Sequence, residues 1–98
     1  MRAHRFAVSC GARAMNISFA GSSPSQLEHR ALLWAITHGC VAVAAAGNRG
    51  FRGGDAPQYP AAYANDGLCI QVGASDAWDR RAVFSSYGPG LDLLAPGV

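Results

Sequence analysis

A continuous run of apolar residues from Cys40 to Ala46 (CVAVAAA) constrains the fold most. The run has the length of a β-strand. Apolar residues at every position, rather than at every second one, are typical of a strand that is covered on both faces in a parallel sheet. The chain has only 98 residues, and a domain of that size buries only about 60–65% of the surface of its unfolded form. The run therefore predicts an α/β sheet that so short a chain hardly covers by itself.

The residues before this run predict a strand and a helix. Residues 12–19 alternate apolar Met15, Ile17 and Phe19 with polar side chains, as a strand does. The following residues fit a helix start, with Ser23 as the N-cap, Pro24 at the first helical position and Gln26 completing a capping box. The helix is expected to end at Gly39. Its apolar side is expected to hold Leu27, Ala31, Trp34 or Ala35, and His38, opposite Glu28, His29 and Arg30.

Strand, helix and apolar strand together predict a βαβ unit with a right-handed crossover. A helical turn over residues 5–10, stopped by Gly11, is expected before the unit. Residues 49–57 are rich in glycine and predict an irregular loop, and further strands are expected over residues 68–73 and 91–94. The fold class predicted from this pattern is α/β with a parallel sheet.

Composition argues against several function classes. Eight basic residues against six acidic ones give a net charge of +2, and they are scattered, so no basic surface for nucleic acid or a membrane is expected. No apolar run approaches the ~18–20 residues that span a bilayer. The three cysteines form no C-x-x-C pair, which argues against a zinc site or a disulfide scaffold and favours small buried thiols.

The carboxyl ends of the two strands are the expected functional site, because parallel sheets bind ligands at that edge. These ends are residues 18–21 and residues 46–48, and the second presents Asn48 directly after a glycine. An asparagine amide has no titratable proton, but it donates hydrogen bonds to a developing negative oxygen. An asparagine after a glycine is also a common turn residue, so both interpretations stay open on the residues alone.

Six blocks of sequence resemble the subtilisin-like serine proteases, in the family's order and with compatible spacing. The chain's versions are GARAMNISFAG at 11–21, GCVAVAAAGN at 39–48, YPAAY at 59–63, IQVGA at 70–74, FSSYG at 84–88 and LDLLAPGV at 91–98. They are similar to the family patterns G-A-x-V-I-N-M-S-x-G-G, G-V-x-V-V-A-A-A-G-N, Y-P-A-x-Y, I-x-V-G-A, F-S-N/S-x-G and x-D-x-x-A-P-G-V. The resemblance implies a subtilisin-like fold, three-layered α/β/α in the full domain.

The resemblance also implies roles for individual residues. Asn48 matches the asparagine whose side chain stabilises the oxyanion of acyl transfer. The other residues that it assigns to substrate binding match a strand edge that pairs with an extended polypeptide and the walls of the primary specificity pocket: Ser18, Phe19, Ala20, Gly21, Ala45, Ala46 and Gly47. The expected partner is a polypeptide substrate, and secretion is a tendency of the family.

No cofactor is expected. Asp92 matches a carboxylate that, in some members, holds a weak cation together with carbonyls near Ala61 and Tyr63; a solvated turn aspartate is the alternative. The peptide bond between Tyr59 and Pro60 matches one that is cis in the family.

The catalytic triad of the family is not found in the sequence. The motifs D-S/T-G, H-G-T/H and G-T-S-x-A-x-P are absent, and His4, His29 and His38 are expected to be surface or helix-end residues. Ser85 and Ser86 match a structural loop. Residues 1–98 therefore resemble the central part of a peptidase domain, incomplete at both ends, and we expect this chain to be inactive alone, since the triad acts as a unit.

Two other functions fit the residues. One is a non-catalytic module that keeps the peptide-binding edge without the triad. The other is a nucleotide-binding α/β module, because glycines at 47, 50, 53 and 54 follow a strand and carry Arg49 and Arg52 among them. The dinucleotide fingerprint G-x-G-x-x-G and the G-K-S/T signature are both absent, which argues against the second.

Overall fold

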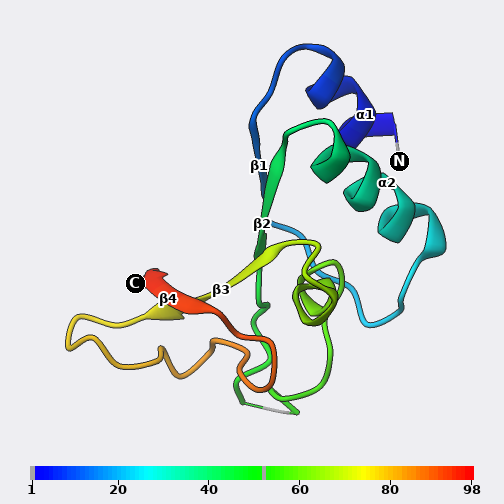
Figure 1. The fold of residues 1–98 in the computed structure, drawn as a ribbon. Coiled ribbons are helices and arrows are strands. Elements are labelled where there is room, and N and C mark those ends of the chain that lie inside the picture. The colour runs from blue at the N-terminus through cyan, green and yellow to red at the C-terminus, as the bar shows by residue number, and fades with distance from the viewer. Residues whose placement is uncertain (1, 52) are drawn as a thin grey trace.

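The sheet of this protein is parallel and has four strands in sequential order. A computed structural model describes residues 2–51 and 53–98. Its strands are β1 (Ala14–Ile17), β2 (Val41–Ala45), β3 (Ile70–Ser75) and β4 (Leu93–Pro96), arranged β1-β2-β3-β4. The helices are α1 (Arg2–Ser9), α2 (Gln26–Thr37) and the 3₁₀ helix η1 (Ala61–Asp66). Figure 1 shows this arrangement. The predicted α/β class with a parallel sheet is confirmed.

The register brings the carboxyl ends of neighbouring strands to one edge of the sheet. Ala14 lies beside Val41 and Ile17 beside Ala44, so β1 and β2 end together. Val43 lies beside Ile70, and Val72 lies beside Leu93. The connection from β1 to β2 runs through α2, and η1 lies in the connection from β2 to β3. The segments that follow β1 and β2 therefore leave the sheet at the same edge.

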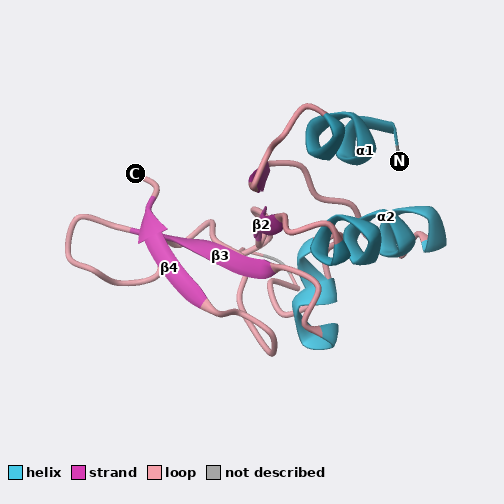
Figure 2. Ribbon diagram, turned by 45° about the horizontal axis from the view of Figure 1, so that its top comes forward, coloured by secondary structure: helices cyan, strands magenta, loops and turns pink. Residues whose placement is uncertain are grey.

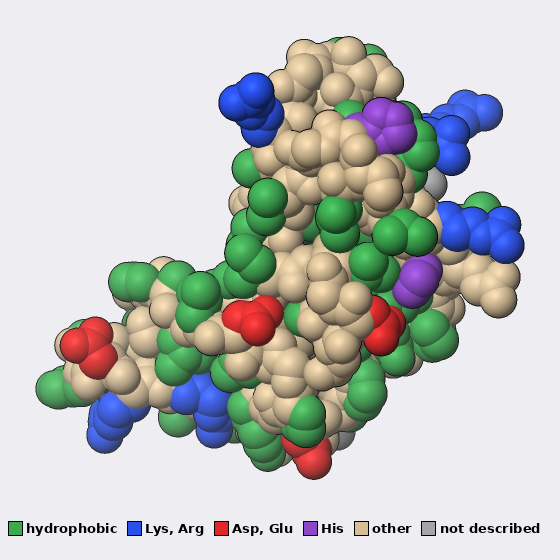
Figure 3. Space-filling view, in the orientation of Figure 1, with side chains coloured by type: hydrophobic (Ala, Val, Ile, Leu, Met, Phe, Trp, Pro, Cys, Tyr) green, Lys and Arg blue, Asp and Glu red, His purple; other side chains and the backbone are tan. Residues whose placement is uncertain are grey.

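In the part of the chain that the structure describes, the helices cover only one face of the sheet, and they lie to the same side of it in Figure 2. Side chains on that face are buried, among them Met15, Ile17, Ala42 and Ala44, and they form one core with Leu32 and Ala35 of α2, with Tyr63 and Ala61 of η1, and with Cys40 and Leu68. The opposite face holds Val41, Ile70 and Leu93, which are 50%, 37% and 48% exposed. Hydrophobic side chains accordingly reach the surface at many points in Figure 3.

Helix α2 begins later than the sequence predicts. Its N-cap is Ser25, whose Oγ accepts a hydrogen bond from the Glu28 N–H at 3.3 Å, so the predicted start at Ser23 and Pro24 is wrong by two residues. The buried face is also different: Glu28 is buried, whereas Leu27 is 69% exposed. Burial raises the pKa of the Glu28 carboxyl. A tertiary contact at Ser25 accounts for the later start.

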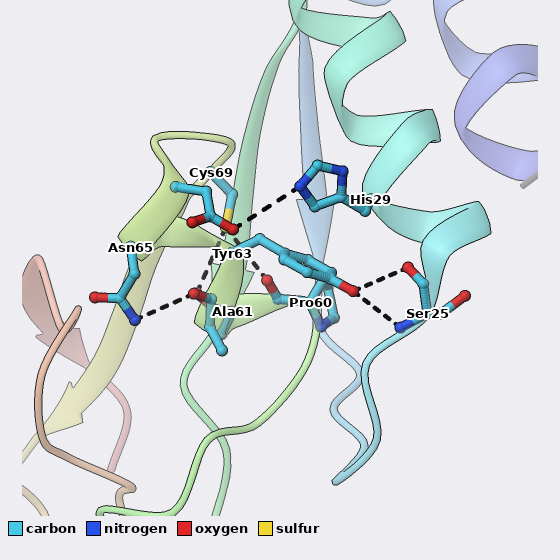
Figure 4. A network of polar contacts seen from close by, with 9 residues as sticks. Ser25, His29, Pro60, Ala61, Tyr63, Asn65 and Cys69 are labelled. Carbon is cyan, nitrogen blue, oxygen red and sulfur yellow. Dashed lines mark hydrogen bonds and ion pairs between the residues drawn. The ribbon is translucent and has the colours of Figure 1, made fainter.

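That contact comes from Tyr63 of η1, as Figure 4 shows. The Tyr63 hydroxyl accepts a hydrogen bond from the Ser25 N–H and donates one to the Ser25 carbonyl, both at 2.9 Å. The two bonds fix the backbone of the N-cap residue in an extended conformation, which makes Ser25 the last residue before the helix. A tyrosine 38 residues away therefore decides where α2 starts.

The remaining elements differ from the predicted bounds by a few residues. The first helix is longer than predicted, the strands begin or end within three residues of their expected positions, and η1 was not predicted. The peptide bond between Tyr59 and Pro60 is cis. No helix in the described parts of the chain is long and apolar enough to cross a bilayer.

Candidate functional site

Asn48 lies in the loop that leaves the carboxyl end of β2. The pairing of β2 with β3 continues to Ala46, whose N–H donates to the Val72 carbonyl at 2.8 Å. Beyond Gly47, the Asn48 side chain is exposed, and no hydrogen bond joins its amide to another of the described residues. The amide N–H groups at this position are therefore available to an incoming oxygen.

The backbone on both sides of Asn48 is fastened to the segment 84–86. The Gly47 carbonyl accepts a hydrogen bond from the Ser86 N–H at 2.9 Å, and the Arg49 N–H donates to the Ser86 Oγ at 3.0 Å. One residue later, the Gly50 N–H donates to the Phe84 carbonyl at 2.9 Å. An exposed asparagine is thus carried on a backbone that is held at both neighbouring peptide groups.

A concave surface of about 370 Å³ lies beside Asn48 at the carboxyl edge of the sheet, and we call it the C-edge pocket. Its lining residues come from the ends of β1, β2 and β4 and from within β3: Ser18, Ala45, Ala46, Gly47, Asn48, Val72, Gly73, Ala74, Ala95, Pro96 and Gly97. It brings together Ser18 and Asn48, which the sequence predicted to meet. Small side chains on every wall leave room for another chain segment.

Three of the predicted site residues do not line this pocket. Phe19 is 51% exposed and lines a separate cavity of about 260 Å³ with His4 and Met15. Ala20 is exposed. Gly21 forms an antiparallel bridge with Tyr59, in which its N–H donates at 2.9 Å and its carbonyl accepts at 2.7 Å. The backbone of Gly21 is therefore already engaged within the chain.

The sequence analysis missed the contributions of β3 and β4 to the pocket. Residues 72–74 lie within β3, and residues 95–97 end or follow β4; all of them line the pocket. The signal that predicted residues 18–21 and 46–48 applies equally to them, because all four strands are parallel and end at the same edge. The ends of the third and fourth predicted strands could have been included on that ground.

The residues of the expected weak cation site make other contacts. The Asp92 Oδ2 accepts a hydrogen bond from the Gln71 N–H at 2.8 Å, and the Asp92 N–H donates to the Gln71 carbonyl at 3.0 Å. The Ala61 carbonyl accepts from the Gln71 Nε2 at 3.0 Å. Among the described residues, no group of three or more His, Cys, Asp or Glu side chains could hold a metal ion. Asp92 thus fastens β4 to the start of β3.

The three histidines lie away from the C-edge pocket. His38 stacks on Trp34 at the C-cap of α2, as expected of a helix-end residue. The His29 Nε2 lies 3.8 Å from the Asp66 Oδ2. The His29 ring also packs edge-on against the ring of Tyr63, and both residues are drawn in Figure 4. The prediction is wrong for His4, which is only 4% exposed and has no partner for its Nε2 among the described residues. Burial lowers the pKa of His4.

All three cysteines are free thiols, and one of them differs from the prediction. Cys40 is buried in the core, whereas Cys10 is exposed after the end of α1. Burial, together with the negative charges of Asp92 and Glu28, raises the pKa of Cys69 to about 11. Its Sγ lies 3.5 Å from the Pro60 carbonyl oxygen and 3.6 Å from that of Ala61. Such a thiol stays protonated at neutral pH, which argues against a nucleophilic role for Cys69.

The model of the subtilase family, peptidase S8, matches residues 1–98. This chain belongs to the subtilase family. It is 43% identical over 88 residues to subtilisin BL of Lederbergia lenta and 38% identical over 92 residues to thermitase of Thermoactinomyces vulgaris. These alignments cover 90% and 94% of this chain but only 30% and 31% of the two relatives. The chain thus spans about a third of the length of these curated relatives.

Solved structures of subtilisin-like proteases share the fold. The protease Apa1 of the Antarctic psychrotroph Pseudoalteromonas sp. AS-11 superposes with a TM-score of 0.80 at 32% identity, over 93% of this chain and 20% of that one. The prenylagaramide maturation protease PagA gives a TM-score of 0.83 at 26% identity, over 98% of this chain and 35% of that one. The sheet and helices described above therefore form part of the subtilisin-like fold.

Proposed function

We propose that this chain forms the oxyanion-binding and substrate-binding part of a serine endopeptidase that cleaves polypeptides by acyl transfer. The observation that carries the proposal is the position of Asn48. Its unpaired side-chain amide projects from the carboxyl end of a buried parallel strand, beside a concave surface and on a backbone held at Gly47 and Arg49. Membership of the subtilase family supports the same reaction.

In this reaction a serine hydroxyl attacks the scissile carbonyl, and the carbonyl oxygen becomes an oxyanion in the tetrahedral intermediate. A preorganised amide N–H lowers the free energy of that state because it need not reorient as the charge develops. The Asn48 Nδ2 is the donor that we assign to this role. The reaction proceeds through side-chain and backbone groups of the enzyme, so the proposal involves no cofactor.

The substrate polypeptide is proposed to pair with residues 18–20. They follow β1, which stands at one end of the described sheet, and all three are exposed. An extended peptide can add to such an edge through backbone hydrogen bonds. We propose Ala45, Ala46 and Gly47 as the wall of the primary specificity pocket, with Gly21 holding the segment in place through its bridge to Tyr59.

The nucleophile and the general base are proposed to come from residues that this chain does not contain. Among the described residues, no histidine lines the C-edge pocket, and His29 lies on α2, where its Nε2 is 3.8 Å from the Asp66 Oδ2. Losing one triad member is severe, with about 10⁶ lost in kcat in a subtilisin that lacks the nucleophile. The 98-residue chain alone is therefore expected to bind peptides without cleaving them.

The test uses a chimaera in which this chain replaces the segment of subtilisin BL that aligns with it over 88 residues. The remainder of that protein is to supply the Asp, His and Ser motifs. We expect the chimaera to cleave a peptide substrate and the 98-residue chain to show no turnover. We expect Asn48→Ala to lower the kcat of the chimaera by about 10²–10³ with little change in KM, the magnitude known from a subtilisin, a member of this family.

Asn65→Ala is the matched control, because Asn65 is an exposed amide on η1, away from the C-edge pocket. Equal kcat values for Asn48→Ala and Asn65→Ala in an active chimaera would contradict the role of Asn48. Peptide binding by an otherwise inactive, folded chimaera would favour the non-catalytic module instead.

The nucleotide-binding alternative has less support from the fold. A phosphate-binding glycine loop opens a helix directly after its strand. Within the described residues from 46 to 60, the chain forms turns and bends but no helix, and residues 47–50 fold onto the segment 84–86. Arg52, one of the two arginines that suggested this function, lies outside the described residues.

A further inference from the structure

Two neighbouring serines lie between β3 and the loop that carries Asn48. Ser85 and Ser86 are 1% and 2% exposed, so both hydroxyls are buried. A buried hydroxyl is costly unless it is hydrogen-bonded. The partners of these two hydroxyls are backbone N–H groups on opposite sides of the dipeptide, one of them next to Asn48.

Ser86 contacts both peptide groups that flank Asn48. Its N–H donates to the Gly47 carbonyl at 2.9 Å, and its Oγ accepts from the Arg49 N–H at 3.0 Å. Two hydrogen bonds to Ser86 therefore hold the backbone on either side of Asn48. Gly47 lies so close to this serine that a Cβ built on it would be 3.1 Å from the Ser86 Oγ.

Ser85 makes the corresponding contact to β3. Its Oγ accepts from the Ala74 N–H at 3.0 Å and donates to the Ser86 carbonyl at 3.0 Å. Gly73, Ala74 and Asn48 all line the C-edge pocket. The dipeptide thus spans the distance between the end of β3 and the loop after β2.

We infer that Ser86 is the positioning residue of Asn48. It holds the peptide groups on either side of Asn48, and Ser85 ties it to β3, so that the Asn48 amide is presented at a fixed place on the C-edge pocket. The inference rests on the proposed function, because the purpose of the positioning is the presentation of the oxyanion donor. Neither serine is a nucleophile, since both are buried and their Oγ atoms accept from backbone N–H groups.

Amide hydrogen exchange of the unmodified chain tests the geometry without any variant. The Arg49 residue is exposed, and the Ser86 Oγ is the acceptor of its N–H. We expect the Arg49 amide to exchange at least about tenfold more slowly than an unstructured amide, as a hydrogen-bonded N–H does. Exchange at the unstructured rate would overturn the inference, whatever the enzyme activity.

Kinetics of the chimaera test the consequence for Asn48. Ser86→Ala removes the acceptor of the Arg49 N–H, and we expect kcat to fall about tenfold, with KM changed less than about twofold. Because Ser86 acts through Asn48, the double variant with Asn48→Ala should be no slower than Asn48→Ala alone. Multiplication of the two single effects would overturn the inference.

Ser85→Ala is the matched control, because it removes an equally buried hydroxyl that bonds to β3 rather than to the Asn48 loop. Because Ser85 reaches the Asn48 loop only through Ser86, we expect Ser85→Ala to lower kcat less than Ser86→Ala does, and a loss of kcat as large as that of Ser86→Ala would contradict the direct role of Ser86. If Asn48→Ala leaves kcat unchanged while the Arg49 amide is protected, the proposed function fails and the geometry stands. If Ser86→Ala does not fold, the exchange rate in the unmodified chain still decides.

Discussion

At the scale of single residues, Gly47 shows how tightly the loop after β2 is packed. Its φ of +109° is a conformation that a residue with a side chain rarely adopts. A Cβ built there would lie 3.1 Å from the Ser86 Oγ and 3.2 Å from the Gln58 Cγ. Both neighbours are buried, with Gln58 only 6% exposed. The sequence requires glycine here for its conformation and for its size.

We expect Gly47→Ala to lower the free energy of unfolding of the chimaera by about 2–4 kcal/mol, from backbone strain of about 1–2 kcal/mol and overpacking of similar size. Gly11→Ala is the matched control, because Gly11 has a φ of +91° but nothing within 4 Å of the added Cβ. Urea unfolding should show a smaller loss for Gly11→Ala. Equal losses would mean that the contacts with Ser86 and Gln58 contribute nothing.

Some residues around the candidate site could be predicted from the sequence and others could not. The position of Asn48 at the carboxyl end of β2 could be predicted from the sequence, because a glycine and an amide residue directly follow an apolar strand of a parallel sheet. Ser86 could not be predicted to hold it, since the contact joins residues 37 positions apart and depends on how the segment 82–88 folds back. The buried state of His4 was missed for a related reason: α1 packs against α2, which the sequence of α1 does not show.

At the scale of elements, periodicity predicted the strands and α2, while tertiary contacts set their limits. Ser22, Ser23 and Ser25 are all suitable N-caps. The local sequence favours Ser23, because a proline follows it, but the hydrogen bonds of Tyr63 select Ser25. The helix η1 was missed because it is short and depends on its packing against β3.

The link between η1 and α2 can be tested by Tyr63→Phe, which leaves the Ser25 N–H without its acceptor and the Ser25 carbonyl with only the His29 N–H as a donor. Unsatisfied groups of this kind cost about 1–3 kcal/mol when buried, and we expect a loss in that range in the free energy of unfolding of the chimaera. The control is Tyr87→Phe, because Tyr87 is 40% exposed and the hydrogen bond of its segment to Gly54 comes from its backbone N–H. A loss no larger than that of the control would contradict the role of Tyr63 at the N-cap.

At the scale of the whole molecule, the sheet has one helix-covered face and one open face. Side chains alternate between the two faces along each strand. The register pairs Val43 with Ile70 and Val72 with Leu93, so Val41, Ile70 and Leu93 all lie on the same, open face. The continuous apolar run that includes β2 had predicted cover on both faces. The curated relatives are about three times longer than the aligned region, so a protein of their length has further residues with which to cover the second face.

Because the face is open in this chain but expected to be covered in a longer protein, we expect the same double variant to have opposite effects in the 98-residue chain and in the chimaera. In the 98-residue chain, the open apolar face should cause self-association that depends on concentration, and Val41→Thr with Ile70→Thr should reduce it. In the chimaera, where the remainder of subtilisin BL is expected to cover this face, the same two substitutions should lower the free energy of unfolding by about 1–3 kcal/mol each, since they bury hydroxyl groups. Sedimentation velocity measures the first effect and urea unfolding the second.

Val83→Thr is the matched control, because Val83 is 67% exposed and lies outside the sheet. It should change neither the self-association of the chain nor the free energy of unfolding of the chimaera. Equal stability losses in the chain and the chimaera would mean that the face is no more covered in the larger protein than in this chain.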